Sequence, residues 1–169
     1  MFGEAKLPVL NFLSKTWVLI TLFIAMLAIG YSFSLVMPAV GGVLLDTLFT
    51  SEEVLARLGE MSAGQKRVHL LATIVIDTAY PLAYGGLMLG LTWRFAGLLR
   101  NWFIIAPLAV MFVDFAENLV QALALVDNTA LLSLKDFLTP AKFGLFAVAV
   151  VLVLVSFLIA ALRKLRGTG

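Results

Sequence analysis

The stretch WFIIAPLAVMFVDFAENLVQALALV, residues 102–126, decides the class of fold. As a helix that rises about 1.5 Å per residue, it is long enough to cross about 30 Å of hydrocarbon. It also carries Asp114, Glu117, Asn118 and Gln121, whose spacing of i, i+3, i+4 and i+7 places them on one helical face. An ionisable group in hydrocarbon costs roughly 2.5 to 3.5 kcal/mol on insertion scales, so this side of the helix is not expected to face lipid. The stretch therefore predicts a membrane-spanning helix whose polar face turns toward other helices.

The rest of the chain has the same membrane character. Of its 169 residues, 62% are hydrophobic and 13% are charged, whereas a soluble domain has roughly 25% charged residues. Its mean hydropathy is +1.07. Four apolar runs are long enough to span a bilayer, and they cover about residues 16–37, 70–93, 102–126 and 140–162. We expect a single integral membrane domain, residues 1–169, with an all-α fold: a four-transmembrane-helix bundle.

The first run has some features of a secretory signal peptide. Lys6 and Lys15 precede it, and Ala28-Ile29-Gly30 resembles a small-residue cleavage site. The apolar stretch continues past that point to Met37. We therefore expect a retained helix.

Lys and Arg residues near the helix ends predict the orientation, because cytoplasmic loops carry the excess of them. One side of the bundle holds seven: Lys6, Lys15, Arg94, Arg100, Arg163, Lys164 and Arg166. The other side holds four basic residues, Arg57, Lys66, Arg67 and Lys135. It also holds six acids. We expect a multipass protein of the bacterial inner (plasma) membrane with both termini cytoplasmic.

The connection between the first two runs, residues 38–64, predicts a short amphipathic helix in the outer loop. Thr50 and Glu53 have the spacing of a capping box, and an apolar stripe follows them. Ser62 and Gln65 form a second capping box that starts the next helix, with His69 expected at the membrane interface. The outer loop is either a simple connector or a lid over the outer end of the bundle.

Polar residues from the other runs are expected to meet the polar face of residues 102–126. The second run carries Thr73, Asp77, Tyr80 and Tyr84 at helical spacing, and Pro81 removes one backbone hydrogen bond among them. Tyr31 and Ser34 come from the first run and Lys142 from the fourth. Counted from the helix ends, these groups fall in the outer half of the bilayer, so we expect the site to open outward. The candidate ligand-binding residues are Asp77, Tyr80, Tyr84, Asp114, Glu117, Asn118 and Lys142.

The charges of this predicted cluster do not balance. Three carboxylates against one ammonium leave a formal charge of about −2 in a low-dielectric pocket. We expect at least one acid to hold a proton near neutral pH, and Lys142 to pair with Asp77 or Glu117. A purely structural interpretation competes with the functional one, because buried polar networks also fix helix packing.

Three short segments resemble a group of uncharacterised bacterial four-helix integral membrane proteins. They are Asp77 with Tyr80-Pro81, Asp114 with Glu117-Asn118, and Thr139 with Lys142, in the patterns D-x-x-Y-P, D-x-x-E-N and T-x-x-K. The resemblance covers nearly the whole chain and implies the fold, but it brings no known activity. Signal peptidase II also has four helices and two outer Asp residues, but its conserved Asn-containing segments have no counterpart here.

Several functional classes are excluded or disfavoured by residue content. The chain has no cysteine and one histidine, so thiolate chemistry is excluded and a typical metal centre is not expected. A net charge of +2, with basic residues at membrane edges, does not fit nucleic-acid binding. No cofactor is expected, and no nucleophile is recognisable.

The preferred hypothesis is a binding or transport module for a cation, a proton or a small polar or amphiphilic ligand. Asp77 and Glu117 are its expected principal ligands. The first alternative is an accessory or assembly subunit completed by a membrane-protein partner. The second is a lipid-processing enzyme with Glu117 as general base and Lys142 as electrophile, although the residue pattern leans away from enzymes. Membrane lipid is the one partner expected in every case.

Overall fold

The computed structural model describes residues 7–167 and is all-α within that range. Lys6, which entered the charge count, lies outside the described residues. Four helical stretches are long and apolar enough to span a membrane: Thr16–Val40, Ala63–Phe95, Gly97–Leu125 and Leu132–Leu165. The four-helix membrane bundle expected from the sequence is therefore confirmed.

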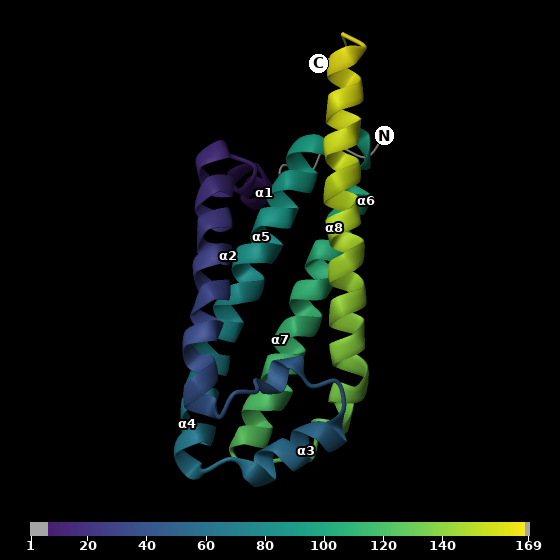
Figure 1. Ribbon diagram of the computed structural model, residues 1–169. Helices are drawn as coiled ribbons and strands as arrows, with labels where there is room; N and C mark the ends of the chain where they lie inside the picture. The colour runs from purple at the N-terminus through teal and green to yellow at the C-terminus, as the bar shows by residue number, and fades with distance from the viewer. Residues whose placement is uncertain (1–6, 168–169) are drawn as a thin grey trace.

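Each span is built from one or more helical segments, with short helices at the ends (Figure 1). In chain order the segments are α1 (Pro8–Leu13), α2 (Thr16–Val36), η1 (Met37–Val40), η2 (Leu45–Thr47), α3 (Ser51–Glu60), α4 (Ala63–Ala72), η3 (Thr73–Asp77), α5 (Thr78–Phe95), η4 (Gly97–Leu99), α6 (Arg100–Phe103), α7 (Ile105–Leu125), η5 (Leu132–Leu134) and α8 (Lys135–Leu165).

Two helices begin well before the apolar runs that predicted them. The second span starts at Ala63, before the apolar run that begins near residue 70, and this start confirms the predicted Ser62 capping box, which satisfies the first backbone N–H groups of the helix. The fourth starts at Lys135 rather than Pro140. Pro140 lies in the second turn of α8, so it interrupts the hydrogen bonding of α8 only near its start. This early start brings Lys135 into the bundle.

The outer loop contains the predicted amphipathic helix. Helix α3 carries the full capping box, since the Thr50 side chain accepts from the Glu53 N–H while Glu53 accepts from the Thr50 N–H. The backbone N–H groups of Thr50 and Phe49 also hold the pKa of Glu53 below its usual value. Val54 and Leu58 turn inward and join a core cluster with Val120 and neighbouring residues of α7. Helix α3 thus closes one end of the bundle, while α1 and the end of α8 lie at the other end (Figure 1).

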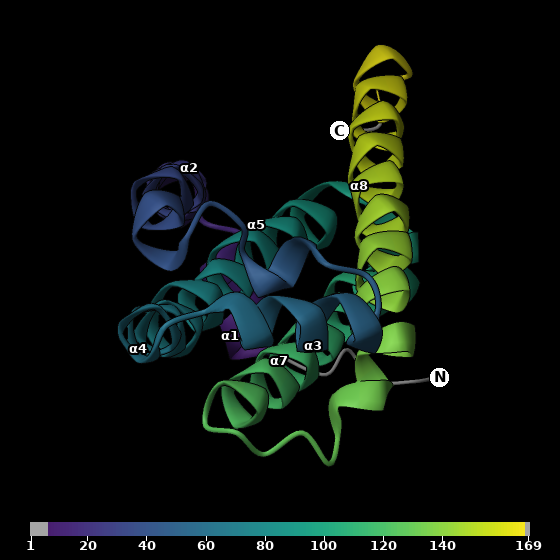
Figure 2. The same cartoon turned by 60° about the horizontal axis from the view of Figure 1, so that its bottom comes forward.

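Helix α5 lies at the centre of the packing and contacts α1, α2, α7 and α8. Its glycines Gly86 and Gly90 allow close approaches of this kind. A Cβ built on Gly90 would lie 2.5 Å from the Leu13 carbonyl oxygen, and one on Gly86 would lie 3.3 Å from Leu22. Helices α2 and α8 stand on opposite sides of α5 (Figure 2). Therefore α5 is the element that joins the bundle together.

Candidate functional site

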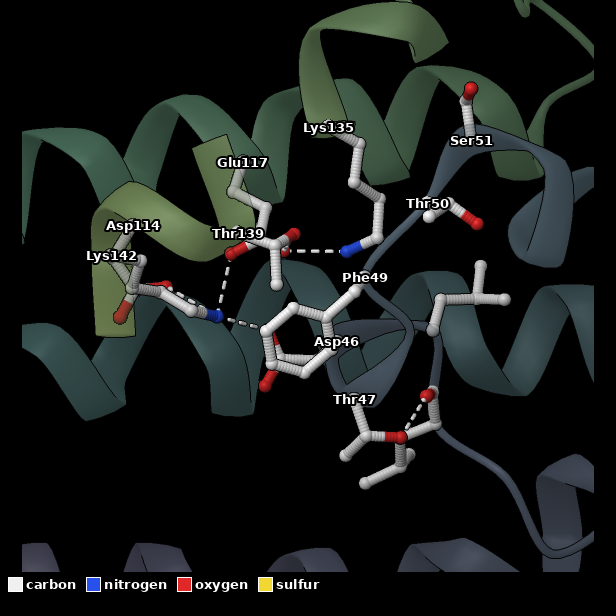
Figure 3. Close-up of polar contacts among 12 residues, drawn as sticks. Asp46, Thr47, Phe49, Thr50, Ser51, Asp114, Glu117, Lys135, Thr139 and Lys142 are labelled. Atoms are coloured by element: carbon white, nitrogen blue, oxygen red, sulfur yellow. Dashed lines mark hydrogen bonds and ion pairs between the residues drawn. The ribbon is translucent and has the colours of Figure 1, made fainter. Parts of the chain in front are cut away.

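A network of buried ionised side chains joins α7 to α8, with Glu117 at its centre (Figure 3). Glu117 Oε1 lies 2.5 Å from Lys135 Nζ and accepts a hydrogen bond of 2.5 Å from the Thr139 hydroxyl. Glu117 Oε2 lies 2.6 Å from Lys142 Nζ. The side chains of Glu117 and Lys135 are fully buried. Since an isolated buried charge is very costly, each of these groups depends on its partners.

Lys142 connects this network to the outer loop and to Asp114. Its Nζ lies 2.6 Å from Asp46 Oδ1 and 3.6 Å from Asp114 Oδ1. The Tyr84 hydroxyl donates to the other oxygen of Asp114 over 2.7 Å. The ammonium of Lys142 therefore lies among three carboxylates. Of the two partners that the sequence predicted for Lys142, Asp77 or Glu117, the structure has Glu117.

These three carboxylates, Asp46, Asp114 and Glu117, could in principle hold a metal ion. One oxygen from each lies within 4.8 Å of the others. The Lys142 ammonium, however, contacts all three. An internal cation takes the position that a metal ion would need, so these residues do not fit a metal centre.

The loop that carries Asp46 is held by buried contacts. The backbone N–H of Leu45 donates to His69 Nε2 over 3.0 Å, which leaves the proton on Nδ1 to donate to the Thr73 hydroxyl at 3.2 Å. Burial alone would raise the pKa of Asp46, but the charge and hydrogen bond of Lys142 outweigh that effect and hold this pKa below its usual value. The outer loop is therefore part of the site.

The backbone around Asp77 is shaped by Pro81, as the sequence suggested. Pro81 has no N–H, so the carbonyl of Asp77, four residues earlier, loses its helical partner. The side-chain amide of Asn118 replaces it, donating to that carbonyl over 2.9 Å. The preceding turn, Thr73–Asp77, is π-helical, a distortion that is frequent at functional sites. Asn118 therefore holds the Asp77 backbone rather than its carboxylate.

A cavity of about 250 Å³ lies beside the ionic network. Its lining residues come from η2, η3, α5, α7 and α8, and they are Asp46, Asp77, Tyr80, Tyr84, Asp114, Lys142, Phe143 and Phe146. Asp77 is only 6% exposed. Within residues 7–167 no side chain donates a hydrogen bond to its carboxylate or forms an ion pair with it. The cavity thus has one buried acid whose bonding capacity is unused.

The structure brings together all seven sequence-predicted site residues, though in two different settings. Five of them line the cavity, whereas Glu117 and Asn118 are engaged in the packing between helices. The expected contribution from the first span is wrong. Tyr31 is 67% exposed, and Ser34 donates to the Tyr31 carbonyl of its own helix.

Three residues of the site were missed by sequence reasoning: Asp46, Lys135 and His69. Asp46 lies in the outer loop, where acids are usually solvated, and Lys135 was counted as a charge at the membrane edge. His69 was expected at the interface but is fully buried. The usable signal for Lys135 was its spacing of i, i+4 and i+7 with Thr139 and Lys142, which places all three on one face of α8.

The fold and site define a four-helix integral membrane protein with a buried ionic network next to a small polar and aromatic cavity. Comparison with protein-family models, with curated proteins and with solved structures finds no match for this chain.

Proposed function

We propose that this chain is a binding or transport module that takes a cation, a proton or a small polar or amphiphilic ligand into the cavity. The observation that supports this proposal is the buried carboxylate of Asp77 in the cavity wall, which has no partner among the described residues. Asp77 keeps a small exposed surface where it lines the cavity, so an N–H or O–H donor can reach its carboxylate there. A ligand that supplies such a donor would complete the hydrogen bonding of this acid.

The other residues have supporting roles in this proposal. Glu117 holds Lys135 and Lys142 in place and is not free to be a principal ligand. Tyr84 positions Asp114 through its hydroxyl, and Asn118 supports the backbone of Asp77. Lys142 offsets part of the negative charge of the cavity. Asp77 is therefore the residue on which binding depends most.

The location and family of the protein belong to the same proposal. The excess of Lys and Arg at the end that carries α1 and the tip of α8 supports cytoplasmic termini in a bacterial inner membrane. The cavity then faces the outer half of the bilayer, beneath the loop that carries Asp46. The D-x-x-Y-P, D-x-x-E-N and T-x-x-K segments support membership of the uncharacterised four-helix group that they resemble.

Native mass spectrometry of the purified chain in a mild detergent tests this function. The wild type is compared with Asp77→Asn and with the control Asp127→Asn, whose carboxylate is exposed and pairs with Lys66 at the bundle end. Asn suits position 127, where φ is +64°. We expect a small molecule to stay bound to the wild type and to the control but not to Asp77→Asn. Equal retention by all three proteins, or no bound molecule together with no Asp77-dependent proton uptake, would reject the proposal.

An accessory-subunit role is a second candidate, and the exposure of α2 favours it. Only 11% of the most apolar part of the first span is buried within the bundle, so α2 has a long face that a partner helix could cover. Copurification of a stoichiometric membrane protein that is lost when Ile24 and Leu27, both more than half exposed, are changed to Trp would support this role. The lipid-processing alternative has less support, because its expected base, Glu117, is held by two ammonium groups and a hydroxyl.

A further inference from the structure

We propose that the ligand of this cavity is a small primary amine, bound as its ammonium with an apolar or aromatic body. This inference rests on the proposed function and specifies the chemical class that the same cavity selects. It depends on the charge of the lining, on its aromatic residues and on the unused bonding capacity of Asp77.

The charge of the lining favours a cation. Three of the eight lining residues are acids, Asp46, Asp77 and Asp114, and one is a lysine, so with all four ionised the lining carries a formal charge of about −2. Lys142 already pairs with Asp46, and the Tyr84 hydroxyl already bonds Asp114. Asp77 is the remaining acid. A ligand ammonium at Asp77 would reduce the imbalance and would complete the partners of that carboxylate.

The aromatic part of the lining favours an organic cation over a metal ion. Four lining residues are aromatic, and the ring of Tyr84 packs edge-on against those of Tyr80 and Phe146, with centroids 5.4 and 5.2 Å apart. Hard metal ions such as Ca²⁺ and Mg²⁺ prefer about six or more oxygen ligands, which such walls do not supply. Aromatic rings do attract organic ammonium groups. Lys142 gives an internal example, since its Nζ lies 5.3 Å from the ring centroid of Phe143.

Asp77 distinguishes a primary amine from a quaternary one. A buried carboxylate gains most from an N–H donor, because a charge without hydrogen bonds leaves its oxygen lone pairs unsatisfied. A primary ammonium offers three N–H donors, whereas a quaternary ammonium offers none. The volume of about 250 Å³ lies just below the usual range of about 300 to 1,000 Å³ for drug-sized ligands. The ligand body is therefore small.

Equilibrium dialysis with the full chain in lipid nanodiscs tests this class of ligand. The probe is radiolabelled 2-phenylethylamine, and 2-phenylethanol is the neutral analogue that keeps the body but replaces the ammonium with a hydroxyl. Empty nanodiscs measure partition of each probe into lipid. We expect saturable binding of the amine, with Asp77→Asn weakening it at least about tenfold, as expected for loss of one charge-assisted hydrogen bond. Asp127→Asn should bind the amine like the wild type.

A second variant keeps the test valid if Asp77→Asn does not fold. Phe146→Leu removes one aromatic ring from the cavity lining, and we expect it to weaken binding of the amine several-fold. Equal affinity for the amine and the alcohol, or amine binding that neither variant changes, would overturn the inference. If native mass spectrometry finds a different ligand that needs Asp77 while the amine does not bind, the amine inference fails and the proposed function stands. If nothing binds in an Asp77-dependent way, both fail.

Discussion

Glu117→Gln should be the most destabilising single change in the ionic network. Lys135 is fully buried, and Glu117 is its ion-pair partner at 2.5 Å. With Gln at 117, an uncharged amide faces both ammonium groups, and Lys135 keeps no carboxylate partner among the residues that the structure describes. Lys142 still has Asp46 and Asp114. Removing one partner of a buried pair costs about 3 to 5 kcal/mol, so we expect a loss of that size in the free energy of unfolding.

Lys135→Met should lower the free energy of unfolding less than Glu117→Gln does, although both changes break the same ion pair. Glu117 then keeps Lys142 at 2.6 Å and the Thr139 hydroxyl, so the loss is close to that of one charged hydrogen bond, about 1.5 to 3 kcal/mol. The double variant removes the unpaired ammonium. It should therefore be more stable than Glu117→Gln alone.

Unfolding by added SDS in mixed micelles, followed by circular dichroism, measures all three variants. Asp127→Asn is the control, since its exposed pair should contribute at most about 1 kcal/mol. If the energies of the two single changes simply add in the double variant, Lys135 and Glu117 are not coupled and the reasoning is refuted.

Three further predictions follow from local geometry. Asn118→Leu should lower the free energy of unfolding by about 1 to 3 kcal/mol, because the Asp77 carbonyl that Pro81 leaves free loses its donor. Adding Pro81→Ala should recover part of that loss in the SDS assay. No recovery would argue against this pairing. Gly90→Ala should destabilise by about 1 to 3 kcal/mol through contact with the α1 backbone, whereas Gly144→Ala, which meets nothing within 4 Å, should be neutral or stabilising; equal effects would contradict this reading of the packing. The pKa of Glu53 is lower in the folded protein than in the unfolded chain, so its capping contributes stability above the unfolded pKa of about 4.3. That stability is lost as the pH falls through the lower folded pKa, so the difference in melting temperature between wild type and Glu53→Ala should shrink in acid. A constant difference would show that the carboxylate charge contributes nothing.

The cluster at α7 illustrates how much of the site is local information. Asp114, Glu117 and Asn118 share one face because of helical spacing alone, and lipid cannot solvate them. Their burial was therefore predictable before any partner was known. Pro81 likewise predicted that one backbone hydrogen bond is missing near the polar residues of the second span, although the sequence did not reveal that the Asn118 amide would donate to the Asp77 carbonyl.

The length of the apolar runs and the two capping boxes determined the four spans, the outer helix and the all-α fold from the sequence by itself, because hydrocarbon requires helices to satisfy their own backbone. Only the tertiary structure decided which charges meet. Lys142 and Asp46 are 96 residues apart, and Lys135 and Glu117 are 18 apart on antiparallel helices. Their pairing depends on the fold of the outer loop and on the early start of α8, since a buried ion takes whatever partner the packing brings within reach. The same packing left the carboxylate of Asp77 beside the cavity with no side-chain partner among residues 7–167, so the most informative feature of the site came from long-range geometry.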